Sequence, residues 1–97
     1  MAGPYVIRFA TEAIEDLGSM RAFDRASVRQ EITQHLTHAP THVSRSRIKR
    51  MTQPFWSEYR LRVGDFRVYY NVTENERSVG ILRIVRKGSK QTPQEPP

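Results

Sequence analysis

The sequence has no cysteine, and its hydrophobic runs are only a few residues long. The absence of cysteine excludes disulfides, thiolate catalysis and cysteine-ligated zinc sites. A membrane-spanning helix needs about 20 consecutive apolar residues, so the short runs predict no such helix. Residues 1–5 also lack the basic region and apolar stretch of a secretory signal peptide. We therefore expect a cytoplasmic protein without a membrane partner.

Lysine is also scarce, because Lys49, Lys87 and Lys90 are the only lysines among 16 basic residues and the others are arginines. The planar guanidinium of arginine binds phosphate or carboxylate through two parallel hydrogen bonds, which lysine cannot form. The net charge is +6, and the excess lies in residues 43–97, since residues 1–42 carry more acidic than basic groups. This distribution favours a surface that binds a polyanion such as nucleic acid, with a basic segment that has no binding role as the alternative.

A chain of 97 residues is long enough for one domain. The β-rich run Tyr5–Phe9 predicts a first strand. Apolar residues at intervals of three and four then predict two helices, one with Thr11 as its candidate N-cap and one with Asp24 as its candidate N-cap, which ends at Pro40. The connection between them is short, so the helices form a hairpin. We expect an α+β fold of order β-α-α-β-β-β, with the helix pair packed on one face of an antiparallel sheet.

The second half of the chain reads as strands separated by turns. Gly64-Asp65 is a two-residue hairpin signal with glycine first, as a type II′ turn requires. We expect residues 1–87 to form the domain and residues 88–97, which have no apolar residue to bury, to be a disordered basic and proline-rich tail. The expected strands cover residues 55–63, 66–72 and 78–85, with a short edge strand around Ile48.

The two-residue turn determines which residues of the flanking strands face each other. Apolar residues then share the side that meets the helices, in the pairs Val63–Phe66, Leu61–Val68 and Tyr59–Tyr70. On the other side, Arg62 faces Arg67, Arg60 faces Tyr69 and Glu58 faces Asn71. Like charges that face each other across strands repel, so this side predicts a bound anion, with a solvated face screened by Glu58, Asp65 and salt as the alternative.

The last strand is expected to continue this alternation. Leu82 and Ile84 suit the core side, which places Ile81, Arg83 and Val85 on the arginine side.

Few other groups with catalytic chemistry are present. No acidic cluster accompanies His35, His38 and His42. We therefore expect these residues to be ordinary surface histidines that bind no metal. We also expect no cofactor. A chemistry that needs only cations and geometry is RNA cleavage, in which the substrate supplies its own 2′-hydroxyl and arginines stabilise the charged phosphorane.

Two segments of the meander carry a family resemblance. Residues Tyr59–Tyr70 read YRLRVGDFRVYY and residues Val79–Lys87 read VGILRIVRK. Together they resemble the RelE/ParE toxins of bacterial toxin–antitoxin modules, and the layout is similar over residues 5–87. The resemblance implies a RelE-like fold and a toxin that forms a hetero-oligomer with an acidic cognate antitoxin.

The RNA-cleaving branch of this family cuts messenger RNA in the ribosomal decoding site, and the other branch poisons DNA gyrase. The resemblance thus implies an endoribonuclease (mRNA interferase) with mRNA and the ribosome as partners. Gyrase poisoning and non-catalytic RNA binding stay open as alternatives.

The resemblance also implies site residues. The basic functional positions of the family correspond to Arg60, Arg67 and Lys87, with Arg86 as a neighbouring candidate. We expect Arg67 to bind the scissile phosphate and Arg60 to orient or deprotonate the 2′-hydroxyl, while Lys87 or Arg86 serves the leaving oxygen. Further RNA contacts are expected from Arg62, Arg83, Tyr69, Arg45, Arg47, Lys49 and Arg50.

The sequence departs from the family pattern at two places. Glu58 stands where RNA-cleaving members carry a basic residue, and neither histidine nor tyrosine follows the last strand. Arginine is a poor proton donor, so Tyr69 or Glu58 would have to take over the proton transfers, or the enzyme would depend on ribosomal groups. Finally, the basic run Arg45–Arg50 lies beside an expected unpaired strand edge. That edge suits an acidic antitoxin segment that adds a strand or lays down a helix, with a solvated loop as the alternative.

Overall fold

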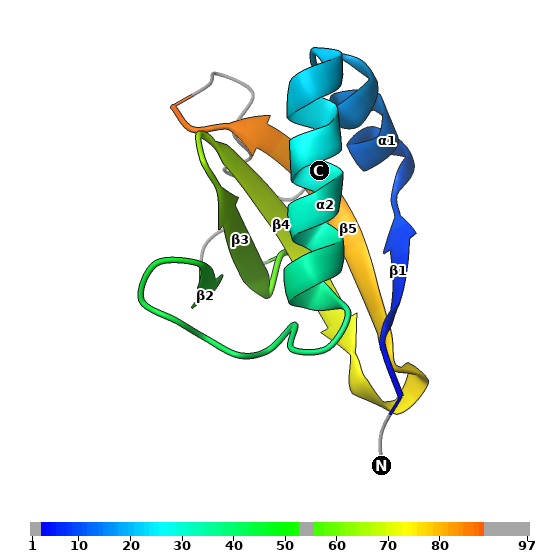
Figure 1. Ribbon diagram of the computed structural model, residues 1–97. Coiled ribbons are helices and arrows are strands. Elements are labelled where there is room, and N and C mark those ends of the chain that lie inside the picture. Colours follow the sequence, from blue (N-terminus) through cyan, green and yellow to red (C-terminus); the bar gives the residue numbers. More distant parts are fainter. Residues whose placement is uncertain (1–2, 53–55, 89–97) are drawn as a thin grey trace.

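The computed structural model describes residues 3–52 and 56–88 (Figure 1). Two helices cover one face of a five-stranded sheet, so the expected α+β class is confirmed. None of the described helices is long and apolar enough to cross a membrane. The elements are β1 (Val6–Phe9), α1 (Thr11–Gly18), α2 (Ala22–Leu36), β2 (Ile48–Arg50), β3 (Tyr59–Val63), β4 (Phe66–Thr73), a 3₁₀ turn (Glu74–Glu76) and β5 (Ser78–Arg86).

The sheet has the order β1-β5-β4-β3-β2 and is mixed rather than antiparallel throughout. Strands β2 to β5 are antiparallel as expected, including the short edge strand at Ile48. The added feature is β1, which pairs with β5 in parallel. Only strands joined by short turns must run antiparallel, and most of the chain separates β1 from β5.

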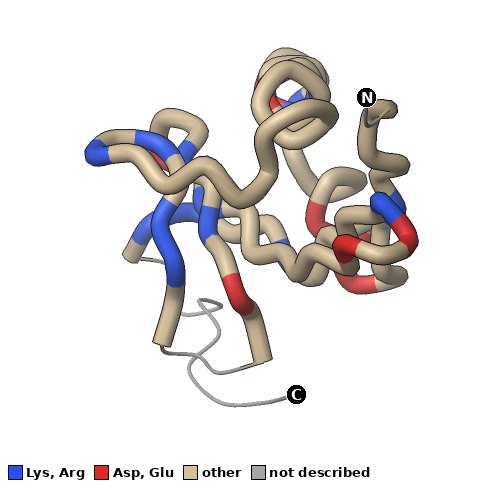
Figure 2. Tube along the Cα trace, turned by 90° about the horizontal axis from the view of Figure 1, so that it is seen from below, with Lys and Arg blue, Asp and Glu red and all other residues tan. Residues whose placement is uncertain are grey.

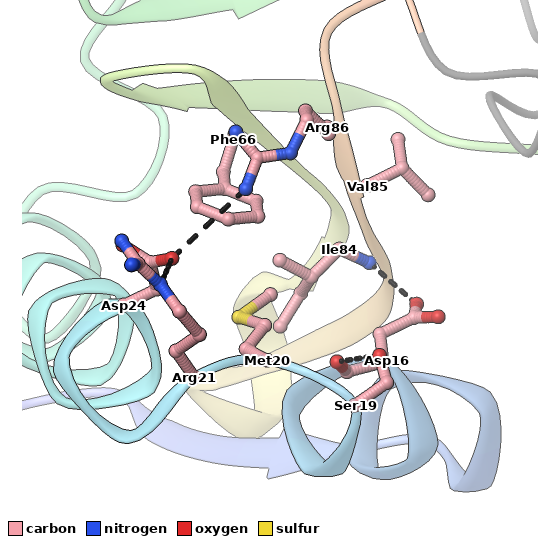
Figure 3. Close-up of a pocket in the computed structure, with 9 residues that line it drawn as sticks. All are labelled: Asp16, Ser19, Met20, Arg21, Asp24, Phe66, Ile84, Val85 and Arg86. Atoms are coloured by element: carbon pink, nitrogen blue, oxygen red, sulfur yellow. Dashed lines mark hydrogen bonds and ion pairs between the residues drawn. The ribbon is translucent and has the colours of Figure 1, made fainter.

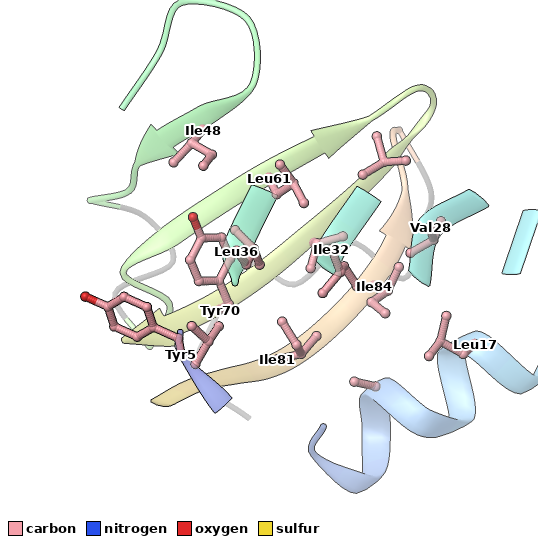
Figure 4. Close-up of a cluster of buried hydrophobic side chains, with 14 residues drawn as sticks. Tyr5, Leu17, Val28, Ile32, Leu36, Ile48, Leu61, Tyr70, Ile81 and Ile84 are labelled. Atoms are coloured by element: carbon pink, nitrogen blue, oxygen red, sulfur yellow. The ribbon is translucent and has the colours of Figure 1, made fainter. Parts of the chain in front are cut away.

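The core lies between the helices and one face of the sheet (Figure 4). Val28, Ile32 and Leu36 of α2 recur at four-residue spacing and are buried. They pack with apolar side chains of the sheet such as Leu61. Tyr70 is also fully buried, and its hydroxyl donates a 2.6 Å hydrogen bond to the carbonyl oxygen of Pro40. This burial raises the pKa of the Tyr70 phenol, so the tyrosine acts as a neutral donor that holds the loop after α2 on the sheet.

Both helices begin without the side-chain caps that the sequence predicted. Thr11 is the first residue of α1, and the residue before it, Ala10, has no side chain that could accept a hydrogen bond. Helix α2 starts at Ala22, two residues before the expected cap Asp24, which instead lies in the first turn near Arg21. The expected tail lies outside the described residues apart from Gly88.

The β3–β4 hairpin has the predicted register. All predicted cross-strand pairs from Tyr59–Tyr70 to Val63–Phe66 are observed. Gly64 has φ +55° while Asp65 is not among the residues with positive φ, which is the pattern of a type II′ turn. The turn therefore selects the register that separates apolar from basic side chains.

Replacement of Gly64 by alanine should lower the free energy of unfolding by about 1–2 kcal/mol, because a Cβ is strained at this φ even though no atom lies within 4 Å. Urea unfolding followed by circular dichroism measures the effect. Gly80→Ala is the matched control, since its site is equally open and its φ is not in the strained range. An equal loss of stability in both variants would contradict the role of the turn.

The predicted alternation on β5 is wrong at Ile81 and Leu82. A β-bulge between β4 and β5 pairs Tyr69 with Arg83 and Tyr70 with Ile81, so that Leu82 is the extra residue. Ile81 is therefore fully buried in the core, whereas Leu82 is only partly buried. A bulge inserts one extra residue into one strand. The residues before it therefore point to the opposite faces of the sheet from those that strict alternation predicts.

Candidate nucleic-acid interface

Three arginines lie on the sheet face turned away from the helices. Arg62 and Arg67 face each other across β3 and β4, and Arg60 lies one pleat away opposite Tyr69. We call Arg60, Arg62 and Arg67 the arginine face. Figure 2 shows basic positions concentrated on one side of the chain trace and most acidic positions on the other. The sequence-based placement of these three residues is confirmed.

Arg67 is held in place by the hairpin turn. Its side chain is buried, with 8% of the residue exposed. Its Nη1 atom donates 2.9 Å hydrogen bonds to the carbonyl oxygens of Gly64 and Phe66. A guanidinium has five N–H donors, so this anchoring leaves others for an anion.

Arg60 carries the clearest sign of an uncompensated charge. Its Nε atom is buried and makes no hydrogen bond within the described part of the chain. Burial lowers the pKa of Arg60 most, and the positive charges of Arg67 and Arg62 lower it further, partly offset by Tyr69. The positive charges of Arg67 and Arg62 therefore repel the guanidinium of Arg60, and a bound anion would reduce this repulsion.

Two lysines extend this face. Lys49 of β2 is paired with Arg60 across the sheet, which continues the basic row onto the edge strand. Lys87 follows β5, and its N–H donates to the carbonyl oxygen of Asp65, so the ladder continues one residue past Arg86. Because Val85 faces Arg67, alternation puts Lys87 on the arginine side as well.

Arg86, in contrast, pairs with the partly buried core residue Phe66 and so lies on the helix side of the sheet, away from the arginine face. It pairs with Phe66, and its guanidinium stacks 4.7 Å from the centroid of that ring. Its nitrogens lie 3.9 Å from a carboxylate oxygen of Asp24 and 3.8 Å from one of Asp65. Neighbouring strand residues point to opposite faces, so Arg86 and Lys87 cannot both reach one substrate atom.

Arg83 is likewise removed from the expected RNA contacts, by an ion pair with α1. Its Nε and Nη2 donate to the two carboxylate oxygens of Asp16 at 2.8 and 3.1 Å. The N–H of Ile84 donates to the same carboxylate at 2.8 Å (Figure 3). The hydrogen bond to Asp16 raises the pKa of Arg83, and the ion pair ties this guanidinium to α1.

The basic residues of the run Arg45–Arg50 lie in different surroundings. Arg47 lies 3.2 Å from a carboxylate oxygen of Glu31 on α2, and Arg50 stacks 5.2 Å from the centroid of the Tyr59 ring on the core side. Arg45 is exposed in the bend before β2. Lys49 is thus the member of the run that the register places on the arginine face.

Two residues that sequence reasoning missed shape the border of the arginine face. The centroids of the Trp56 and Tyr69 rings lie 6.0 Å apart. Asn71 binds both the N–H of Glu58, at 2.6 Å, and the carbonyl oxygen of Trp56, at 3.1 Å. The Glu58 carboxylate accepts the N–H of Val72 at 2.9 Å. The predicted position of Asn71 opposite Glu58 indicated this clamp, by which we mean the hydrogen bonds of Asn71 to Glu58 and Trp56. The Glu58 carboxylate is thus hydrogen-bonded to the backbone and forms no ion pair with an arginine among the described residues.

The remaining candidates do not form a second site. Within residues 3–52 and 56–88, no three histidine, aspartate or glutamate side chains come together to hold a metal. His35 lies 3.1 Å from Glu31 in the same helix. A cavity of about 520 Å³ lies on the helix side, beside the α1–α2 turn (Figure 3). Its two carboxylates, Asp16 and Asp24, already contact arginines.

Comparison with known proteins agrees with this geometry. The family model of the ParE toxin of type II toxin–antitoxin systems (parDE) matches residues 7–90. Comparison with curated protein sequences gives no significant match.

Solved structures of RelE toxins share the fold. The toxin–antitoxin complex RelBE2 of Mycobacterium tuberculosis is 25% identical with a TM-score of 0.77, over 92% of this chain and 98% of the other. The RelE–RelB complex of Pyrococcus horikoshii is 21% identical with a TM-score of 0.69, over 87% and 96% of the two chains. A mutant of Escherichia coli RelE in the free state is 16% identical with a TM-score of 0.64, over 91% and 87%. The chain therefore belongs to the ParE toxins of the RelE/ParE family and is the toxin of a type II toxin–antitoxin module.

Proposed function

We propose that this toxin is a ribosome-dependent endoribonuclease that cleaves messenger RNA in the cytoplasm and is neutralised by an acidic antitoxin. The arginine face carries the proposal. Among the described residues, Arg60, Arg62 and Arg67 form no ion pair with a carboxylate, although several other arginines of the chain do. A group of uncompensated guanidiniums on one face fits an RNA backbone.

The reaction needs little beyond these cations. A 2′-hydroxyl oxygen attacks the adjacent phosphorus, the bond from phosphorus to the 5′-oxygen breaks, and the products carry a 2′,3′-cyclic phosphate and a 5′-hydroxyl. In the proposed arrangement Arg67 binds the scissile phosphate and Arg60 orients the 2′-hydroxyl. Lys87 faces the leaving oxygen, and Arg86 does not take part. Guanidinium groups fixed before the substrate arrives stabilise the charge that develops on the phosphorane.

The proton transfers are assigned to Tyr69 and to ribosomal groups. Tyr69 faces Arg60 across the hairpin. Glu58, the other expected base, uses one carboxylate oxygen to bind the N–H of Val72. An enzyme with this set of groups should be slow on free RNA and faster on translated mRNA.

Gyrase poisoning is a second candidate. It is favoured by the match to the ParE family model and by the absence of histidine or tyrosine after the last strand. The arginine face would then bind an acidic protein surface or DNA.

Mapping of mRNA 5′ ends after induced expression tests the proposal. We expect new 5′-hydroxyl ends inside translated reading frames, and their loss when a start codon is removed from the reporter mRNA. Intact mRNA together with a DNA-damage response would establish gyrase poisoning instead. No growth arrest, together with RNA binding that weakens steeply with salt, would establish a non-catalytic module.

The antitoxin partner is also part of the proposal. The solved relatives from M. tuberculosis and P. horikoshii are complexes of a RelE-type toxin with its antitoxin. We propose that this chain forms such a hetero-oligomer and that an acidic antitoxin segment covers the arginine face.

A further inference from the structure

We propose that Arg8 of β1 binds a phosphate of the messenger RNA upstream of the cleaved bond. The RNA would then run from the arginine face over β4 and β5 to β1, on the side of the sheet turned away from the helices, which we call the open face. This inference rests on the proposed nuclease function, because it gives the path of the RNA that the same site cleaves.

The register of β1 places Arg8 on the open face. Its neighbours Ile7 and Phe9 pack against the core on the helix side. Because side chains of a strand alternate between the two faces, Arg8 points to the other side. Arg8 pairs with Gly80 of β5, and Gly80 pairs with Asn71 of β4. These three residues therefore form one row across the neighbouring strands β1, β5 and β4 (Figure 1).

Arg8 is an exposed cation that the fold does not neutralise. Within residues 3–52 and 56–88, it forms no ion pair with a carboxylate. Arg83, a cation of the adjacent strand β5, is bound to Asp16 and so is already compensated. Arg8 therefore has its guanidinium available for a phosphate, which such a group binds through two parallel hydrogen bonds.

The surface between Arg8 and the arginine face is low. Gly80 has no side chain, and a Cβ at this position would have no atom within 4 Å. Asn71 is held by its hydrogen bonds to backbone atoms just before β3. The open face therefore has room for a nucleotide chain between Arg8 and Arg60.

The spacing of the strands separates Arg8 from Arg60. Three strand spacings of about 4.8 Å lie between β1 and β3, which gives about 14 Å across the sheet. The row of Arg8 also lies two residues beyond the pair of Tyr69 and Arg60, which adds about 7 Å along the strands. Side chains stand roughly perpendicular to a sheet, so the two arginines should bind different phosphates of one chain.

The proposed roles of the site residues give the direction of the RNA. Lys87 faces the leaving 5′-oxygen of the downstream nucleotide, Arg67 binds the scissile phosphate, and Arg60 orients the 2′-hydroxyl of the upstream nucleotide. Lys87, Arg67 and Arg60 follow one another in this order along the strands, and the row of Arg8 comes next. The upstream part of the RNA therefore continues toward Arg8.

The sheet offers no such continuation beyond β2. Lys49 is the basic residue of this edge strand on the arginine side. The carbonyl oxygen of Ile48 accepts the N–H of Ser44 at 2.9 Å, and its N–H donates to the Ser44 hydroxyl at 3.2 Å. The bend before β2 therefore closes most of the outer edge, which corrects the unpaired edge expected at the run Arg45–Arg50. Room for a longer RNA lies toward β5 and β1.

Binding of uncleavable RNA tests the inference. The probes are single-stranded oligonucleotides that contain a cleavage site mapped in cells, with a 2′-deoxynucleotide before the scissile phosphate so that no cleavage occurs. The long probe has several nucleotides upstream of that phosphate, and the short probe has only one. Fluorescence anisotropy measures both dissociation constants, and circular dichroism confirms that each variant is folded.

Arg8→Ala should weaken binding of the long probe about fivefold at about 0.1 M salt and lower the slope of its salt dependence by about 0.7, because one phosphate contact is lost. Binding of the short probe should not change. Gly80→Leu keeps every cation but fills the path, so it should also weaken only the long probe. Arg29→Ala is the matched control, because Arg29 is exposed on the helix side, 5.9 Å from the centroid of the Phe9 ring. It removes the same charge and should leave both constants unchanged.

The reconstituted translation reaction gives a second measurement. Arg8→Ala should raise KM for programmed ribosomes and leave kcat unchanged, because a contact far from the cleaved bond contributes equally to substrate and transition-state binding. A wild-type KM in this variant would overturn the inference.

The outcomes separate this inference from the proposed function. Equal affinity of Arg8→Ala and Arg29→Ala for the long probe would overturn the path, and mapped cleavage by the wild-type toxin would leave the nuclease proposal intact. Equal weakening of both probes by Arg8→Ala would also overturn the upstream contact. If no new 5′-hydroxyl ends arise in cells, the nuclease proposal and the path both fail.

Discussion

Replacement of Arg67 by alanine is expected to lower mRNA cleavage by about 10²–10³-fold, the effect of removing one preorganised donor from a developing oxyanion. The side chain suits this role because its Nη1 is bound to the carbonyl oxygens of Gly64 and Phe66 before any substrate arrives. The rate is measured from the appearance of 5′-hydroxyl ends on a defined mRNA in a reconstituted translation reaction.

Arg86→Ala is the matched control for Arg67→Ala. Both arginines lie near the same end of the sheet, but Arg86 stacks on Phe66 on the helix side. We expect Arg86→Ala to retain most of the cleavage rate, and Arg67→Lys to be impaired because lysine cannot bind a phosphate through two parallel donors. Wild-type cleavage by a folded Arg67→Ala variant would refute the role of the arginine face. Equal loss in Arg67→Ala and Arg86→Ala would refute the assignment of the two sides.

Replacement of Asp16 by alanine is expected to lower the free energy of unfolding by about 2–3 kcal/mol, somewhat less than the loss typical of a fully buried ion pair. The Asp16 side chain is only 13% exposed. Its carboxylate accepts hydrogen bonds from the Arg83 guanidinium and from the N–H of Ile84. The variant therefore leaves a partly buried charge and a backbone donor without partners. Chemical denaturation measures the change.

Arg83→Ala provides the complementary test. It should destabilise the fold less than Asp16→Ala, because the Asp16 carboxylate keeps the N–H of Ile84. Cleavage per folded molecule should stay at the wild-type level. A variant with normal stability and a lower cleavage rate would show that Arg83 contacts RNA after all.

The arginine face is unfavourable for the stability of the fold. Facing cations repel, and burial of Arg60 disfavours its charged form, so these positions do not serve stability. The fold supports them by local means, through the turn carbonyls that bind Arg67 and the clamp of Asn71 on the start of β3. Binding of an anion, from RNA or from the antitoxin, would then be favoured by relief of this repulsion.

The positions of Arg60, Arg62 and Arg67 could be predicted from the sequence because they depend on local geometry. A two-residue turn at Gly64-Asp65 permits one register, and strand residues alternate between the two faces. Both rules act over a few residues and need no knowledge of the remaining fold. The same locality made the helices and the meander predictable, and the motifs in this hairpin and in the last strand together carried the family resemblance.

The tertiary structure decided the rest, because the deciding contacts join distant parts of the chain. Arg83 is bound by Asp16, 67 residues away, and a bulge at Leu82 moved Ile81 into the core. The parallel pairing of β1 and the closure of the β2 edge by Ser44 also depend on how separate segments meet. Charge and periodicity thus determined that an arginine-rich face exists, whereas packing determined which arginines remain available on it.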